Sequence, residues 1–143
     1  MTIKFHYKKI VGLEGKTQKI IALRPIIPLS IRQGNGQIRY EALIDSGADF
    51  CIFHAELGRL LGLDIEKGMR KKFGGVTGQT GIAFIHAVTL DLGGFEVETE
   101  CGFSDDISRD GYGILGQDGF FDNFKVTFDR RSEKVELVPK AIN

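Results

Sequence analysis

The sequence contains no tryptophan, only two cysteines and three prolines, and no excess of charge of either sign. Its nineteen basic and nineteen acidic side chains cancel, and no run of five like charges occurs. A nucleic-acid backbone or an anionic membrane surface attracts proteins through a concentrated basic patch. We therefore expect no nucleic acid as a partner and no membrane contact within this chain.

Long apolar runs are also lacking. The most apolar stretch, "IIALRPIIPLSI", is interrupted by Arg24, Pro25 and Pro28. A membrane-spanning helix needs about 20 consecutive apolar residues, so this stretch predicts no span, and it does not have the form of a signal peptide. A targeting or membrane segment upstream of this sequence would not be visible in it.

The two cysteines are too few for a disulfide framework, and no neighbouring residues have the spacing of a zinc site. Cys51 in "DFCIF" and Cys101 in "VETECGF" lie among apolar residues, which favours buried thiols. We expect a reducing compartment, a cytoplasmic location, no metal and no cofactor.

What the sequence does contain is apolar and polar residues in alternation. The 143 residues suit a single domain, and period-two alternation runs through residues 3–7, 38–44 and 95–103. Glycine-rich or polar breaks typical of hairpins separate such stretches, at residues 32–37, 91–94 and 128–135. These patterns predict an all-β, mostly antiparallel domain.

Only two segments favour helix. Residues 54–63, "HAELGRLLGL", place Leu57, Leu60 and Leu61 on one face of a helix that begins near His54. Residues 116–124, "GQDGFFDNF", are long enough for one or two turns. We expect residues 1–23 to form an N-terminal strand and loop extension, and residues 24–143 to form the main domain.

The stretch "ALIDSGAD" places Asp45 at the end of an apolar strand, directly before a Ser-Gly turn. A carboxylate near the core normally has a partner or a chemical role. Gly47 allows a tight bend, and Ser46 can hydrogen-bond across it. The alternative is an ordinary Asp-Ser-Gly turn, which is a common tripeptide.

Two further elements follow. "FGGVTGQTG" has four glycines, at positions 74, 75, 78 and 81, which is more than a tight turn needs. This segment is either an ordinary hairpin or a mobile loop over a substrate. Later, Ile114 and Leu115 precede Gly116, which either ends a strand or marks a close backbone approach.

The order of these elements between residues 24 and 140 resembles the retropepsin-like aspartic proteases. The resemblance implies a closed β-barrel, with one lobe per chain and one or two short helices. It implies that Asp45, Ser46 and Gly47 form the catalytic turn, with Ser46 bracing the two active-site loops. By the same resemblance, the hydrophobic-hydrophobic-Gly element packs behind that turn (Ile114, Leu115, Gly116).

The resemblance also implies a polypeptide substrate. Two groups of residues would contact it, one following the catalytic turn and one forming the flap (Ala48, Asp49; Gly74, Gly75, Val76, Thr77, Gly78). Retroviral members have Arg and Asn after the "ILG" element, whereas this chain has Gln117 and Asp118. The retroviral substrate preference therefore does not carry over.

Aspartic peptide hydrolysis needs two carboxylates that share one proton. Because Asp-Ser-Gly occurs once, we expect a homodimer in which Asp45 of each chain meets at a two-fold axis. The function predicted is an aspartic-type endopeptidase.

The alternative is an inactive peptide-binding or dimerisation module of the same fold. The three histidines do not pair in sequence with a cysteine or with a Gly-x-Ser-x-Gly motif, so a serine or cysteine hydrolase is disfavoured. Asp105, Asp106 and Asp110 lack calcium-loop spacing, which favours a solvated loop.

Overall fold

A computed structural model of the chain describes residues 1–75, 78 and 80–141. These residues form twelve strands, one α-helix and one 3-10 helix. The elements are β1 (Ile3–His6), β2 (Lys8–Glu14), β3 (Thr17–Arg24), β4 (Ile26–Gln33), β5 (Gly36–Ile44), β6 (Ile52–His54), α1 (Ala55–Leu60), η1 (Ile65–Lys67), β7 (Met69–Gly74), β8 (Thr80–Leu92), β9 (Phe95–Ser104), β10 (Gly113–Leu115), β11 (Phe124–Asp129) and β12 (Lys134–Pro139). The mostly β class predicted from alternation is confirmed.

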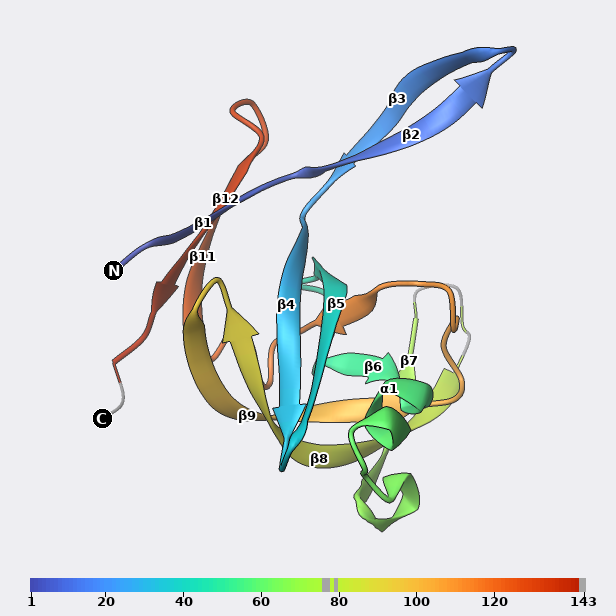
Figure 1. The fold of residues 1–143 in the computed structure, drawn as a ribbon, viewed down its shortest axis with the longest axis vertical. Coiled ribbons are helices and arrows are strands. Elements are labelled where there is room, and N and C mark those ends of the chain that lie inside the picture. The colour runs from blue at the N-terminus through green and yellow to red at the C-terminus, as the bar shows by residue number, and fades with distance from the viewer. Residues whose placement is uncertain (76–77, 79, 142–143) are drawn as a thin grey trace.

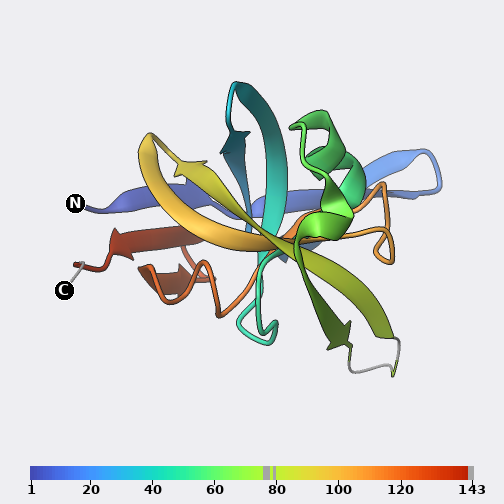
Figure 2. The same cartoon turned by 90° about the horizontal axis from the view of Figure 1, so that it is seen from below.

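The main sheet has seven strands in the order β4-β5-β10-β6-β9-β8-β7, and β4 also pairs with β8. This additional pairing joins the sheet into a ring, and β7 remains as an extra strand at the edge of β8 (Figure 1). Viewed from below, the β7–β8 hairpin extends outward from that ring (Figure 2). The predicted hairpins at residues 32–37, 91–94 and 128–135 are all present.

One core joins the strands of the ring to β1, β11 and β12. Large side chains from all parts of the chain are fully buried there, among them Phe53, Phe103, Phe120, Phe124, Ile27, Ile31, Leu90, Leu92, Leu115 and Leu137. Alternation along β9 follows the prediction, since Phe95, Val97 and Thr99 are half-buried between exposed glutamates. Burial on one face therefore sets the register of β9.

The N-terminal residues divide into two parts. Strand β1 pairs with β12 in a three-stranded sheet, and Ile3 is buried in the core. Strands β2 and β3 form a separate two-stranded sheet that projects from the body (Figure 1). The domain boundary at residue 23 stays a prediction. In the structure, β1 pairs with β12 of the body, whereas β2 and β3 pair only with each other among the described strands.

The first helical prediction is confirmed, and the second is wrong. Helix α1 starts at the expected place, where Nδ1 of His54 accepts a hydrogen bond from the amide of Glu56 at 3.1 Å. Leu61 is buried and Leu57 packs against the core, whereas Leu60 is 73% exposed, and the helix also buries Ala55 and Gly58. A Cβ on Gly58 would lie 2.9 Å from the Phe103 ring, so this face of the helix must be small to approach β9.

Residues 117–123 form turns and a single β-bridge, not a helix, and Phe124 begins β11. Their hydrogen bonds have mixed spacing, from Phe121 N to Gly116 O and from Asn123 N to Phe120 O. Phe120 and Phe124 are both buried in the core. Packing of the aromatic rings therefore outweighs regular helical spacing in this segment.

Candidate active site

The strand that carries Asp45 lies beside the strand that carries Ile114 and Leu115. Strands β5 and β10 pair in parallel, with Leu115 opposite Ile44. The amide of Asp45 donates to the carbonyl of Leu115 at 2.9 Å. The acidic motif and the "ILG" element, which are far apart in the sequence, therefore form one structural unit.

The chain after β10 passes the turn of residues 45–49 at close range. The amides of Gln117 and Asp118 donate to the carbonyls of Ala48 and Asp49, each at 2.8 Å. A Cβ on Gly116 would lie 2.5 Å from the carbonyl oxygen of Phe50, so no larger residue fits there. Both interpretations of Gly116 are borne out, since β10 ends directly before it and the backbones approach closely there.

The turn itself holds the carboxylate of Asp45 in place. Oδ1 of Asp45 accepts a hydrogen bond from the amide of Gly47 at 2.9 Å, and the Asp45 carbonyl accepts one from Ala48 at 3.2 Å. Asp45 is half-buried and Ser46 is exposed. The Ser46 carbonyl accepts a hydrogen bond from Nε2 of Gln117 at 2.7 Å. The turn thus presents a carboxylate in a fixed orientation at the surface.

Asp45 lines a cleft of about 980 Å³. The cleft is lined by the catalytic turn, the β7–β8 hairpin and the loop after β9: Asp45, Gly47, Ala48, Ile52, Phe73, Gly74, Gly75, Thr80, Asp106, Ile107, Ser108 and Ile114. An apolar cluster that is distinct from the main core includes Phe50, Phe73, Ile107 and Ile114, and the last three of these line the cleft. This is a large, mostly apolar site with few carboxylates, which suits the side chains of a peptide.

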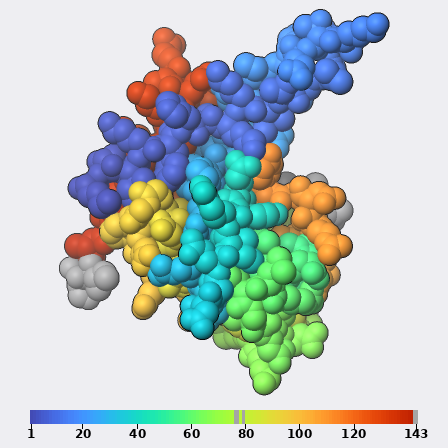
Figure 3. Space-filling view, in the orientation of Figure 1, coloured from blue at the N-terminus to red at the C-terminus, as the bar shows by residue number. Residues whose placement is uncertain are grey.

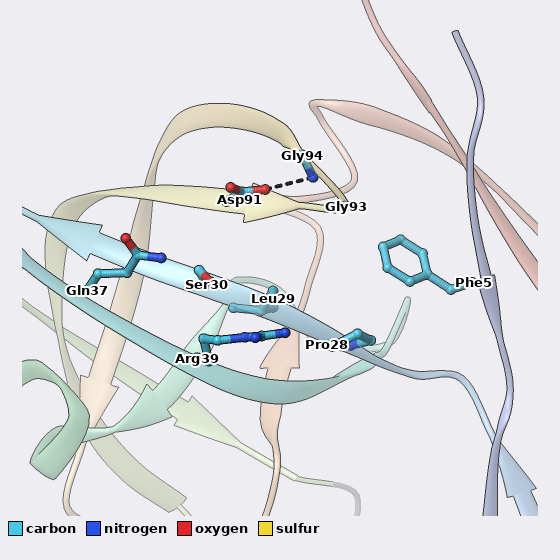
Figure 4. A pocket seen from close by; sticks show the side chains of 9 residues that line it. All are labelled: Phe5, Pro28, Leu29, Ser30, Gln37, Arg39, Asp91, Gly93 and Gly94. Carbon is cyan, nitrogen blue, oxygen red and sulfur yellow. Dashed lines mark hydrogen bonds between the residues drawn. The ribbon is translucent and has the colours of Figure 1, made fainter.

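A second cavity lies elsewhere on the body. It measures about 320 Å³ and is lined by residues of β1, β4, β5 and the β8–β9 turn (Figure 4). Its polar groups include Arg39 and Asp91, and the Asp91 carboxylate already accepts a hydrogen bond from the Gly94 amide at 2.8 Å. None of the predicted site residues lines it, so we place the candidate site at the larger cleft.

The structure places most of the predicted residues in or next to the cleft. Asp45, Gly47, Ala48, Gly74, Gly75 and Ile114 line the cleft, and Leu115 and Gly116 are buried behind the turn. Ser46 and Asp49 are exposed beside it, and Gly78 lies in the hairpin connection with a φ of 83°. Val76 and Thr77 lie outside the described residues.

Sequence analysis missed the loop after β9. Oδ2 of Asp106 accepts a hydrogen bond from the amide of Ile82 at 2.8 Å, and the Asp106 amide donates to Oγ of Ser104 at 3.0 Å. These bonds anchor β8 next to the cleft, and Ile107 adds an apolar wall. Asp105 and Asp106 are exposed loop residues, as predicted, and both also make specific hydrogen bonds. The Asp-Asp pair alone gave no signal, because its partners come from β8 and α1.

Both cysteines are buried, as predicted, and both are free. A hydrogen bond with Cys51 and full burial raise the pKa of the Cys101 thiol well above its ordinary value. A nucleophilic cysteine needs an exposed, acidic thiol, so Cys101 is structural.

Within residues 1–75, 78 and 80–141, no group of three or more His, Cys, Asp or Glu side chains could hold a metal ion. No helix in the described part of the chain is both long and apolar enough to cross a membrane.

Comparison with known proteins bears directly on this site. Residues 27–118 match the model of the aspartyl protease family. The solved structure of EIAV protease complexed with the inhibitor HBY-793 is similar, with a TM-score of 0.50 and 25% sequence identity. The match covers 66% of this chain and 82% of the EIAV chain. No curated protein matches this chain.

Proposed function

Because the chain belongs to the aspartyl protease family, we propose that it is an endopeptidase in which Asp45 activates a water molecule. The observation that carries this proposal is the position of Asp45, whose carboxylate is held by the Gly47 amide at the wall of the 980 Å³ cleft. The bond from Asp45 N to Leu115 O keeps the turn rigid beneath it. A fixed carboxylate next to an apolar cleft is what general acid-base hydrolysis of a peptide requires.

We propose further that the reaction uses two copies of the chain. One carboxylate takes a proton from the attacking water, while the other, protonated, donates its proton to the scissile carbonyl oxygen. The motif Asp-Ser-Gly occurs once, so each chain supplies one Asp45 to an isologous homodimer. Ser46, exposed at the turn, lies where the two turns would meet.

The substrate we propose is an extended polypeptide. It would lie between the turn at Ala48 and Asp49 and the hairpin at Gly74, Gly75, Val76, Thr77 and Gly78. Because Phe73, Ile52, Ile107 and Ile114 line the cleft, apolar side chains next to the scissile bond are the ones we expect it to accept. Leu115 and Gly116 support the turn from behind.

The substitution Asp45→Asn tests the mechanism. It keeps the shape of the side chain and removes its ionisable oxygen, so cleavage of a peptide library should fall by several orders of magnitude. Sedimentation of the same variant should show unchanged assembly, since a carboxamide occupies the same volume. Cleavage that persists undiminished, in a preparation free of other proteases, would contradict the assignment of Asp45.

One observation favours the alternative of a peptide-binding module without turnover. Gln117 and Asp118 stand where retroviral members have Arg and Asn, so the surroundings of the turn differ from those of active viral enzymes. The same peptide library separates the two functions. Retention of peptides by both wild type and Asp45→Asn, with no cleavage by either, would establish binding alone.

A further inference from the structure

The β2–β3 hairpin, Lys8–Arg24, stands away from the rest of the molecule. Its two strands pair with each other, and the strand pairings of the described chain include no third strand beside them. In the space-filling view it projects from the body as a narrow extension (Figure 3). A lone two-stranded ribbon is at best marginally stable in water, so this hairpin needs a surface to pack on.

One face of the hairpin is apolar and uncovered. Val11 lies directly opposite Ile20, so the two side chains share a face, and Leu13 lies on it two residues further along β2. Val11 is 53%, Leu13 is 74% and Ile20 is 50% exposed. We call Val11, Leu13 and Ile20 the arm face. Its three neighbouring apolar side chains are more than the scattered exposure normal for a protein surface.

The hairpin is also strongly basic, although the chain as a whole is neutral. Five of the nineteen basic residues and one of the nineteen acidic residues lie between positions 8 and 24. The remaining chain therefore holds fourteen basic and eighteen acidic residues. The hairpin carries a charge of +4 and the rest of the chain carries −4. A second copy of this chain is thus a partner of complementary charge.

The base of the hairpin lies next to the catalytic turn. The carbonyl of Pro25, which directly follows β3, accepts a hydrogen bond from the amide of Ile44 at 3.0 Å. Nζ of Lys8, in β2, lies 2.6 Å from Oε1 of Glu41, which is in β5 like Ile44. Figure 1 shows the hairpin leaving the body beyond the end of β5. An arm at this place can reach across a two-fold axis that passes between two catalytic turns.

We propose that the β2–β3 hairpin is a dimerisation arm whose apolar face packs on the body of a second copy of this chain. The inference rests on the proposed function, because the dyad requires two chains. Two-fold symmetry doubles the number of arm contacts in the dimer, since each chain both extends an arm and receives one. An anionic membrane would attract the arm but repel the acidic remainder, so the second copy is the occupant that the charges favour.

The test compares dimer dissociation constants of full-length chains by analytical ultracentrifugation. The variant V11T/L13T/I20T removes the apolar face and retains residues that suit strands. The control L60Q/V138T removes apolar side chains with exposed fractions of 73% and 38% that lie outside the arm. A second variant, K9E/K16E, reverses two exposed charges of the arm and leaves its apolar face intact. Circular dichroism verifies that each variant folds.

We expect the dissociation constant to rise about tenfold or more in V11T/L13T/I20T, because three apolar side chains lose their contact with the partner. It should also rise in K9E/K16E and stay unchanged in the control. Peptide cleavage by V11T/L13T/I20T should return to the wild-type rate at high protein concentration, since its Asp45 is intact.

Two results would overturn the arm: a dissociation constant in V11T/L13T/I20T equal to that of the control, or a wild-type chain that stays monomeric. Binding to anionic phospholipid vesicles that the arm variant loses, with dimerisation unchanged, would assign the face to a membrane instead. Failure of the proposed function gives a different result: peptide cleavage survives Asp45→Asn, while the dimer dissociation constant still rises in V11T/L13T/I20T.

Discussion

At the scale of single residues, Gln117 connects the strand behind the catalytic turn with the turn itself. Its Nε2 donates to the Ser46 carbonyl at 2.7 Å, and its amide donates to the Ala48 carbonyl at 2.8 Å. These two bonds hold the peptide groups that follow Ser46 and Ala48, close to the carboxylate of Asp45. Displacing a catalytic group by about 1 Å can cost roughly 100-fold in rate, so, with Asp45 as the proposed catalytic group, we expect Gln117 to act as a positioning residue.

The substitution Gln117→Leu removes the side-chain bond and leaves the cleft lining unchanged. We expect kcat for peptide cleavage to fall about tenfold with little change in KM, because the turn loosens while the substrate contacts remain. The free energy of unfolding should fall by only about 1 kcal/mol, the typical effect of one hydrogen bond. Gln37→Leu, at an exposed glutamine of β5, is the matched control. Equal kcat in the two variants would show that Gln117 does not position the turn.

At the scale of elements, an ion pair joins α1 to the loop that follows β9. The Arg59 guanidinium donates to both carboxylate oxygens of Asp105, at 2.9 and 2.7 Å. These hydrogen bonds lower the pKa of Asp105 below its ordinary value of 3.8. Asp105 immediately precedes Asp106, which lines the cleft, so the pair holds one wall of the site against the helix.

The lowered pKa fixes the pH range in which this pair stabilises the fold. Its contribution is fully present above the ordinary pKa of 3.8 and is lost as the pH falls through the lowered pKa of Asp105. Asp105→Asn should therefore reduce the free energy of unfolding at neutral pH. The reduction should be at most about 1 kcal/mol, since the carboxylate is 56% exposed and screened by solvent.

Urea unfolding of both proteins at neutral pH and near pH ~2 measures this difference, which should vanish at the lower pH. Asp64→Asn is the control, because its ion pair with Lys67 is longer, at 3.7 Å, and more exposed. A difference between Asp105→Asn and wild type that persists unchanged near pH ~2 would mean that the Asp105 ion pair is not its cause.

At the scale of the whole molecule, each chain presents one Asp45 and one cleft, so half of the proposed dyad is missing from a monomer. The activity per milligram should therefore rise with protein concentration and level off once the dimer predominates. The midpoint of that rise should agree with the dissociation constant from sedimentation. Activity per milligram that stays constant on dilution into the monomeric range would contradict the shared-carboxylate mechanism.

Local patterns in the sequence are enough to predict much of this architecture. Alternation predicts β9 because one face of that strand is buried and the other is solvated. Glycines predict the β8–β9 turn because Gly93 and Gly94 adopt positive φ angles of 62° and 92°. The end of an apolar strand followed by Ser-Gly marks Asp45. Each of these features depends on residues that are neighbours in the chain.

Tertiary structure decides the features that depend on distant residues. The parallel pairing of Leu115 with Ile44, the hydrogen bond that the amide of Ile82 donates to Asp106, and the pairing of β1 with β12 all join segments that no local pattern connects. Leu60 has the right spacing for burial, yet it is exposed because α1 approaches the sheet through Ala55 and Gly58. A short helix can turn any of its faces to a sheet, and only the packing of the complete core selects one.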